Sequence, residues 1–487
     1  MLFNSLFFIL IFLPLVVWGY WLVNKFNTEH AKLFLVFASL FFYAWWKVEY
    51  LALIFFSIGF NYWVSTFLHQ RKSKQVLILG IVINLTLLFY FKYINFFIDV
   101  ASHLGIIEPS VYAVALPLAI SFVTFQQIAY IVDSYHGKIA NYSFKSYVLF
   151  ITFFPQLISG PIVHHAEMMP QFSQKHRLNY KWLAAGMTFF ILGLFKKVAV
   201  ADELSPFVIQ VFDNDNIGLN VSMMDAWLAA VAYTLQLYFD FSGYSDMAIG
   251  LGLMFGIFLP LNFNSPLKSS SIIAFWRTWH MTLSRFLKDY LYIPMGGNRK
   301  GVVLKLVFLF ITMVLGGLWH GAAYTFVLWG MLHGLYLIIN HVFRYFLLHF
   351  PQYKTTVLQP YVKILAWPLT FIAVVLAFVV FRVQSVNDGF DLLQVMFGLS
   401  GPIQGAPSTL NTNASLGLFI LVFGLIFVVK YFPNTQQILG YQHQQNDIKS
   451  AYWQANIFWL LGGICLLYYS LYKIMTNGYS EFIYRFF

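Results

Sequence analysis

Apolar stretches of about 20 residues recur along this chain from end to end, and they constrain its fold more than any other feature. A stretch of that length can cross a bilayer as an α-helix, because a helix satisfies its backbone hydrogen bonds internally. Only 10% of the 487 residues are charged, whereas 60% are hydrophobic. The stretches do not alternate in the manner of a membrane β-barrel. The sequence therefore predicts an all-α polytopic membrane protein, with a single membrane domain over residues 1–487.

The charges between these stretches predict the topology. We expect helices near 6–23, 32–47, 50–68, 76–98, 113–132, 147–163, 182–199, 226–258, 302–319, 322–346, 361–381, 414–430 and 454–474. Lys and Arg gather in alternate connections, which the positive-inside rule places in the cytoplasm, so 201–225 and 382–413 are expected to be loops on the outer side. Basic residues flank 147–163 at both ends, so this segment with two prolines is expected to be re-entrant. About 12 crossings remain, with both termini outside.

Cysteine usage limits the chemistry. The chain has one cysteine, Cys465, so it cannot form an internal disulfide, and no Cys/His spacing typical of zinc sites occurs. We expect Cys465 to be a core residue and the protein to bind neither a metal nor a resident cofactor.

Two histidines lie within apolar stretches. His320 stands in Gly316-Gly317-Leu318-Trp319-His320-Gly321, and His333 follows in the next stretch. An imidazole in a bilayer loses hydration, so such a histidine is by default a functional-site hypothesis. The neighbouring glycines allow backbone or a ligand to approach closely. The alternative is a histidine that only hydrogen-bonds between helices.

The segment from Asn262 to Lys300 is polar for this chain and rich in aromatic residues. Serines at 269–271 predict the cap of a helix that starts near 272, on which Arg277 and His280 would share a face, as would Trp276 and His280. An interfacial helix with snorkelling arginines is the competing interpretation. The candidate groups for an anionic ligand are Arg285, Arg299 and Lys300, the last two in a glycine-rich turn that is not a P-loop.

Two carboxylates, Asp240 and Asp246, lie inside the long apolar stretch 226–258. Carboxylates at membrane depth are costly, so we expect both to face the protein interior and to pair with Arg277 or His280. The alternative is a buried network that only fixes the register of the helices.

Taken together, six segments of this chain resemble the membrane-bound O-acyltransferase family, in particular its bacterial branch of alginate O-acetylases. The segments that carry the resemblance are Met1–Ser5, Phe154–Pro161, Tyr238–Asp246, Phe275–His280, Tyr292–Gly301 and Leu318–Gly321. The resemblance implies a ring of helices around a central funnel, with a tunnel that joins the two faces of the membrane. It implies that His320 is catalytic and that His280 is the second polar residue of the site, within a catalytic core over about 147–346. Trp276, Arg277, Trp319, Asp240, Asp246 and His333 would support that site.

The resemblance further implies acetyl transfer from cytoplasmic acetyl-CoA, across a bacterial inner membrane, to an extracytoplasmic polysaccharide. An alginate-type polymer is the first expectation, and peptidoglycan, cellulose or a carrier-protein donor are alternatives. His320 would act as general base, while His280 would polarise the thioester carbonyl or orient the acceptor. A proton-coupled transporter or flippase is the alternative outside enzymes, although no internal repeat supports it.

The tail at 475–487 ends in Glu481-Phe482-Ile483-Tyr484-Arg485-Phe486-Phe487. Similar endings in bacterial systems of this type imply that Tyr484 relays the acetyl group to a periplasmic SGNH-type transferase. The alternative is an aromatic anchor at the membrane surface.

Overall fold

The computed structural model describes residues 1–106, 114–140, 142–214, 221–349, 359–399, 412–478 and 480–483. Packing divides the chain into two compact units, each assembled from segments far apart in sequence. The first unit comprises Met1–Val198, Ser242–Leu261 and the described part of Thr435–Phe486, and the second comprises Ala199–Phe241 and the described part of Asn262–Asn434. The long helix α13 (Met223–Met254) contributes to both units. That these units form one functional domain stays a prediction.

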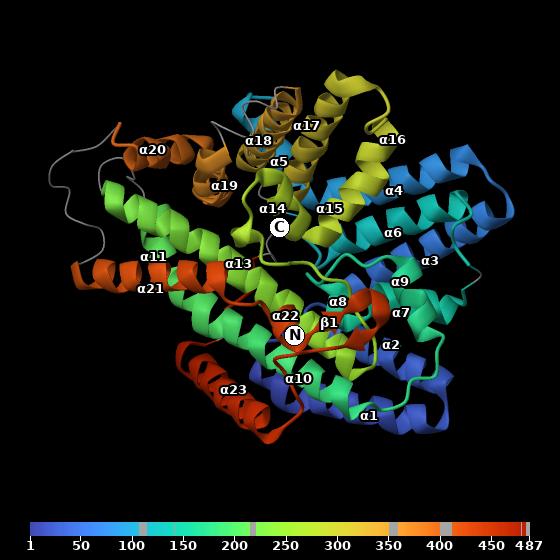
Figure 1. Ribbon diagram of the computed structural model, residues 1–487. Helices are drawn as coiled ribbons and strands as arrows, with labels where there is room; N and C mark the ends of the chain where they lie inside the picture. Colours follow the sequence, from blue (N-terminus) through green and yellow to red (C-terminus); the bar gives the residue numbers. More distant parts are fainter. Residues whose placement is uncertain are drawn as a thin grey trace. The chain divides into compact units, whose positions relative to one another are not determined.

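The first unit is helical except for one short hairpin (Figure 1). Its helices are α1 (Leu13–Phe26), α2 (Thr28–Ala44), α3 (Tyr50–Gln70), α4 (Lys74–Lys92), α5 (Ile94–His103), α6 (Ile120–Tyr135), α7 (Phe144–Thr152), α8 (Phe154–Leu157), α9 (His165–Phe172), α10 (Tyr180–Phe195), α22 (Thr435–Leu439) and α23 (Ile457–Asn477). Shorter elements are the π-helical turns Phe8–Phe12 and Lys196–Ala201, the 3₁₀ turn His443–Gln445, and the antiparallel strands β1 (Tyr441–Gln442) and β2 (Asp447–Ile448).

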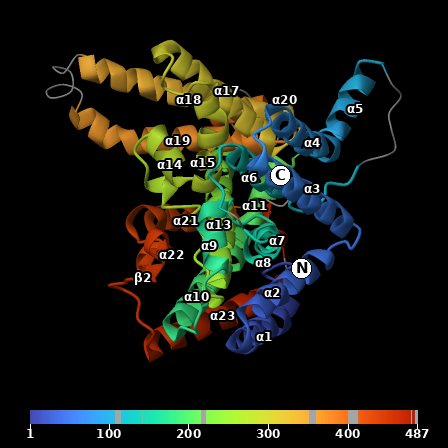
Figure 2. The same cartoon turned by 90° about the vertical axis from the view of Figure 1, so that its right-hand side faces the viewer.

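Side-chain caps and aromatic packing explain much of this unit. The side chain of Asn27 accepts hydrogen bonds from the first-turn amides of α2, and Asn179 and Asn456 do the same for α10 and α23. α1 and α2 lie side by side (Figure 2). Phe8 is fully buried and contacts the rings of Phe42 and Phe154, so the N-terminal segment is fixed to α2 and α8.

The second unit is built around the hairpin of α17 (Gly301–His320) and α18 (Tyr324–His349), which lie side by side (Figure 1). Its other helices are α11 (Asp202–Phe212), α14 (Ile272–Thr278), α15 (Met281–Leu287), α16 (Ile293–Met295), α19 (Gln359–Arg382), α20 (Val386–Met396) and α21 (Thr412–Tyr431), with short helical turns at Pro266–Lys268 and Lys288–Tyr292. A methyl group on Gly317 would lie 2.2 Å from the carbonyl oxygen of Phe326, and one on Gly330 would lie 2.5 Å from that of Met313. Glycine is therefore required at both positions for the backbones of α17 and α18 to approach.

Eight helices in the described residues are long and apolar enough to cross a membrane, which confirms a multi-pass membrane protein. They are Phe8–Phe26, Tyr50–Gln70, Lys74–Lys92, Tyr180–Phe212, Gly301–His320, Tyr324–His349, Ile364–Arg382 and Ile457–Asn477. These spans expose large apolar side chains, such as Trp18 (67%) and Ile339 (64%), as a surface that faces lipid does. The total of about 12 crossings, the position of the termini, and the funnel and tunnel stay predictions.

Several local predictions were wrong. The segments expected to be outer loops contain the amphipathic helices α11 and α20, with Asp202 and Glu203 in the first turn of α11 and Asp388 in that of α20. Cys465 is exposed on α23 and is not a core residue. The segment 147–163 contains the end of α7 and the four-residue α8, and no described helix there is long enough to span a bilayer. This agrees with the expectation that the segment does not cross the membrane, and its re-entrant course stays a prediction.

Candidate active site

His320 is the last residue of α17, and an aromatic box encloses its ring. The centroids of Trp319, Trp329 and Phe381 lie 5.0, 5.1 and 5.3 Å from that of His320, each ring edge-on to the imidazole. His320 is 1% exposed. A side chain at Gly321 would overlap the ring of Phe326, so glycine is required directly after the histidine. The box keeps the imidazole away from bulk water and holds it in one orientation.

His280 lies at a break between helices and not on the helix that the sequence predicted. Ser271 caps α14 at 272 as expected, but α14 ends at Thr278 and α15 begins at Met281. His280 stands between them with φ of 43°, a conformation that is rare and strained for a residue other than glycine. The predicted i,i+3 and i,i+4 pairings of His280 with Arg277 and Trp276 are therefore wrong.

Asn262 holds His280 in this conformation. Its Oδ1 lies 3.1 Å from Nδ1 of His280 and accepts from the hydroxyl of Thr282 at 2.9 Å and from the Thr282 amide at 3.5 Å. The backbone carbonyl of Asn262 accepts from the amide of Met281 at 2.9 Å. The backbone amide of Thr282 can only donate, so the side-chain atom of Asn262 that faces it is the oxygen Oδ1 and not the nitrogen Nδ2. Nδ1 of His280 is therefore the donor, and Nε2 carries the lone pair.

Burial lowers the pKa of His280 to about 3. Burial therefore favours the neutral ring. The ring is thus a weak proton acceptor but a well-placed hydrogen-bond acceptor through Nε2. A lone pair on Nε2 suits the predicted orientation of an acceptor hydroxyl, and the role of His280 stays a prediction.

Trp319 connects the two histidines. Its ring lies 6.2 Å from His280 and 5.0 Å from His320. Trp276 and His333 form the adjoining part of this cluster, because the indole N–H of Trp276 donates to Nδ1 of His333 at 3.2 Å. The buried ring of His333 also lies 4.8 Å from Trp329. The structure thus brings together Trp276, Trp319, His333 and both candidate catalytic histidines, and their roles stay predictions.

The predicted cationic groups lie at the periphery of this cluster. Arg277 is exposed and makes no ion pair with the described residues. Arg285 is half-buried on α15. Arg299 and Lys300 are exposed in the turn before α17, where Arg299 donates to the carbonyl of Ile293 at 3.3 Å and Lys300 lies 5.7 Å from the ring of Phe308. Arg277 is therefore an exposed cation that an anionic ligand could pair with.

The two carboxylates of α13, Asp240 and Asp246, belong to different units. Asp240 is fully buried in the second unit, and its neighbour Phe241 lies edge-on to His280 at 4.9 Å. Asp246 belongs to the first unit, where Lys196 and the hydroxyl of Thr435 each donate to its Oδ2 at 2.6 Å. The expected pairing of Asp246 with Arg277 or His280 is wrong, because a lysine one helix away satisfies the charge.

The last described residues of the chain are held inside the first unit. The side chain of Asn4 donates to the carbonyl of Ser480 at 2.8 Å, and the buried Lys197 donates to that of Glu481 at 3.0 Å. The ring of Phe482 is 2% exposed and lies edge-on to Tyr244 at 4.6 Å. Tyr484 lies outside the described residues.

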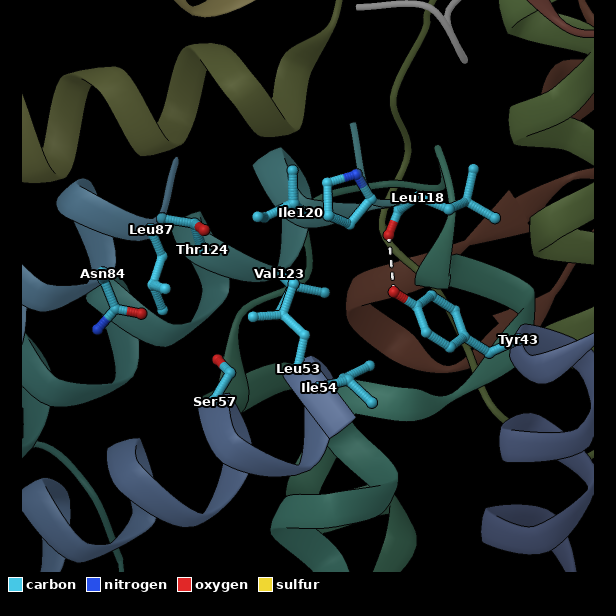
Figure 3. Close-up of a pocket in the computed structure, with 11 residues that line it drawn as sticks. Tyr43, Leu53, Ile54, Ser57, Asn84, Leu87, Leu118, Ile120, Val123 and Thr124 are labelled. Carbon is cyan, nitrogen blue, oxygen red and sulfur yellow. Dashed lines mark hydrogen bonds between the residues drawn. The ribbon is translucent and has the colours of Figure 1, made fainter. Parts of the chain in front are cut away.

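A separate cavity in the first unit is too small for an acyl donor (Figure 3). Its volume of about 30 Å³ is enough for a few water molecules at most. The hydroxyl of Tyr43 closes one side by donating to the carbonyl of Leu118 at 3.0 Å. The lining residues are Tyr43, Leu53, Ile54, Ser57, Asn84, Leu87, Pro117, Leu118, Ile120, Val123 and Thr124.

Comparison with known proteins bears on this geometry. The sequence model of the membrane-bound O-acyltransferase family matches residues 74–381, a range that contains both histidines. A peptidoglycan O-acetyltransferase of Helicobacter pylori is 43% identical over 434 residues, which cover 82% of this chain and 80% of the relative. A probable alginate O-acetylase of Pseudomonas aeruginosa is 39% identical over 462 residues, covering 93% and 85%. A teichoic acid D-alanyltransferase of Streptococcus thermophilus is 25% identical over 315 residues, covering 60% and 71%.

Proposed function

Since this chain belongs to the membrane-bound O-acyltransferase family, we propose that it transfers acetyl groups from acetyl-CoA to a polysaccharide outside the cytoplasm. The observation that carries the proposal is the pair of buried imidazoles, His280 and His320, joined by Trp319 in one aromatic cluster. Its setting would be a bacterial inner membrane, with both termini in the periplasm.

The imidazole of His320 acts as general base in this proposal. It takes the proton of an acceptor hydroxyl, whose oxygen attacks the carbonyl carbon of the thioester. The C–O bond forms, the C–S bond breaks, and the thiolate of CoA leaves and takes up a proton from the imidazolium. Nε2 of His280 accepts a hydrogen bond from the acceptor hydroxyl and orients it toward the thioester. The aromatic box excludes water that would otherwise hydrolyse the thioester.

The donor is a polyanion, and the cations around the cluster suit it. Arg277 supplies an exposed guanidinium without an ion pair to the described residues, and guanidinium groups bind phosphate oxygens in pairs. Arg285, Arg299 and Lys300 would add positive charge on the same cytoplasmic side. The chain as a whole carries a net charge of +11, which attracts such a donor.

The C-terminal tail supplies the first acceptor in this proposal. Tyr484 takes the acetyl group and passes it to a periplasmic transferase of the SGNH type. Support comes from the fixed position of Ser480 to Phe482, because Asn4, Lys197 and Tyr244 bind this segment tightly.

The final polysaccharide has two candidates. The first is an alginate-type exopolysaccharide, favoured by probable alginate O-acetylases that are 39% and 36% identical over 93% and 99% of this chain. The second is peptidoglycan, favoured by the relative with 43% identity. Deletion of the gene, followed by measurement of ester-linked acetate on secreted polysaccharide and on isolated peptidoglycan, tests both. We expect loss on one polymer and restoration by the wild-type chain but not by His320→Ala; unchanged acetate on both polymers contradicts the proposal.

Asn262 is a positioning residue for His280, and its replacement by leucine is expected to lower kcat about 10- to 100-fold, by analogy with groups that orient other catalytic imidazoles. The KM for acetyl-CoA should change little, because the substitution leaves all the donor cations in place. Thr282→Val, which removes only one donor to the same oxygen, should cost about two- to tenfold. Steady-state kinetics with purified variants checks both. A change confined to KM, or a larger loss in Thr282→Val than in Asn262→Leu, contradicts this role.

A further inference from the structure

A second cluster of histidines lies in the first unit, apart from the acyl chemistry. Asp133 near the end of α6 is 1% exposed, and its Oδ2 lies 2.8 Å from Nε2 of His164 and 3.1 Å from Nε2 of His165. The two imidazole rings are 4.2 Å apart. One ligand atom from each of the three residues lies within 4.8 Å of the other two.

We propose that Asp133, His164 and His165 bind a divalent transition metal of the zinc class. Two imidazole nitrogens and one carboxylate oxygen are a common three-ligand set for zinc, with bonds of about 2.0–2.2 Å. Tetrahedral geometry at such lengths separates neighbouring ligand atoms by about 3.3 Å. The distances of 2.8 and 3.1 Å thus need only a small expansion for an ion to replace the two hydrogen bonds.

The burial of the three side chains fits a metal ligand set with one open side. Asp133 and His165 are 1% and 2% exposed, so the fold holds two ligands rigidly. The side chain of His164 is 28% exposed, which gives the ion access and leaves a fourth position for water. Nδ1 of His165 is buried and has no hydrogen-bond partner among the described residues, although buried polar atoms are normally satisfied.

Two contacts compete with the metal and make the proposal testable. The ammonium of Lys138 lies 3.4 Å from the other carboxylate oxygen of Asp133, but its side chain is 66% exposed and can move into solvent. The amide of Ala166 donates to Nδ1 of His164 at 3.3 Å. That bond places the ring proton on Nε2, so metal binding would shift the proton to Nδ1 and give up this long hydrogen bond.

Such a metal would stabilise the fold by linking two segments of the chain and would take no part in acyl transfer. It would join the end of α6 to the start of α9 and so close the segment between Asp133 and His164 into a fixed loop. Binding to the folded protein alone would raise its thermal stability as the metal concentration rises.

The test uses the full chain in lipid nanodiscs, without a polyhistidine tag, after treatment with a chelator. Titration with Zn²⁺ against a chromophoric competitor is expected to give one site per chain, and Co²⁺ should give the visible absorption of a tetrahedral site. Asp133→Asn and His165→Ala should weaken binding at least tenfold, roughly the loss seen when metal ligation is disturbed. The matched control is His443→Ala, which removes a histidine that lies 3.9 Å from Glu167 in the same unit and should leave binding unchanged.

Lys138→Ala provides a variant with little risk to folding, because the side chain is mostly exposed. Removing this competing cation is expected to tighten zinc binding about two- to fivefold, the usual size of an exposed ion pair. Weaker binding in Lys138→Ala, or equal zinc binding in the wild type and in Asp133→Asn, would overturn the proposal. So would the absence of a zinc-dependent rise in Tm for the wild-type chain.

Discussion

Replacement of His320 by alanine is expected to lower acetyl transfer at least about 100-fold, because general base catalysis by a positioned imidazole contributes about 10²–10⁴-fold. The loss should appear in kcat, since the donor cations are left intact, and KM for acetyl-CoA should stay within a few-fold. The measurement is CoA release from acetyl-CoA by purified protein in nanodiscs, with an acceptor present. The substitution also leaves a space inside the aromatic box, so the thermal unfolding of the variant must be recorded in parallel.

His349→Ala is the matched control for this experiment. His349 lies on α18 in the same unit, but it is exposed, and within the described residues it contacts the carbonyl of Tyr345 at 2.9 Å and the Tyr345 ring. Its replacement should leave kcat and KM unchanged. If His320→Ala retains more than a third of the wild-type rate while His349→Ala behaves as the wild type, His320 is not the base.

The helices of this protein were largely predictable, because apolar length alone identifies a span. Both errors in the outer segments have a physical cause. Asp202 and Glu203 suggested a loop, yet acidic residues stabilise the first turn of a helix, and here they begin α11. In α20 the signal was present in the sequence, since Ser385 and Asp388 form a capping box at the expected spacing.

The residues of the candidate site that are close in sequence could be predicted. Of those that are far apart in sequence, only some could be. Trp319 and His320 are adjacent, so one short segment identified both. Asn262, Trp329 and Phe381 were missed because their contacts with the histidines depend on how α14, α18 and α19 pack. The break at His280 was also invisible, since a left-handed histidine depends on the hydrogen bonds that Asn262 supplies.

The cluster at Asp133 illustrates the same limit. Asp133 and His164 are 31 residues apart, a spacing that matches no common zinc pattern. The expectation of a chain without a metal rested on spacing alone. Only the packing of α6 against the start of α9 brings a carboxylate and two imidazoles together.

Tyr484→Phe is expected to lower acetylation of the polysaccharide in cells about 100-fold, because phenylalanine lacks the hydroxyl that would carry the acetyl group. The ring remains, so an anchoring role of this residue would survive the change. Cleavage of acetyl-CoA by the purified variant through water should persist at a low rate, since His320 and its aromatic box are intact. Mass spectrometry of the C-terminal peptide should find one acetyl group on the wild-type chain and none on Tyr484→Phe.

Tyr468→Phe is the control, because Tyr468 lies on α23 and is 73% exposed. It should leave both acetylation and the peptide mass unchanged. The acyl relay and the role of His320 can fail separately in this experiment. Full acetylation in Tyr484→Phe, together with loss in His320→Ala, would show that Tyr484 does not carry the acetyl group. The acceptor would then take the acetyl group directly, with His320 as the base. Loss of polysaccharide acetylation in both variants, with acetyl found on Tyr484 only when His320 is present, would show that the two residues act in successive steps. His320 would act first.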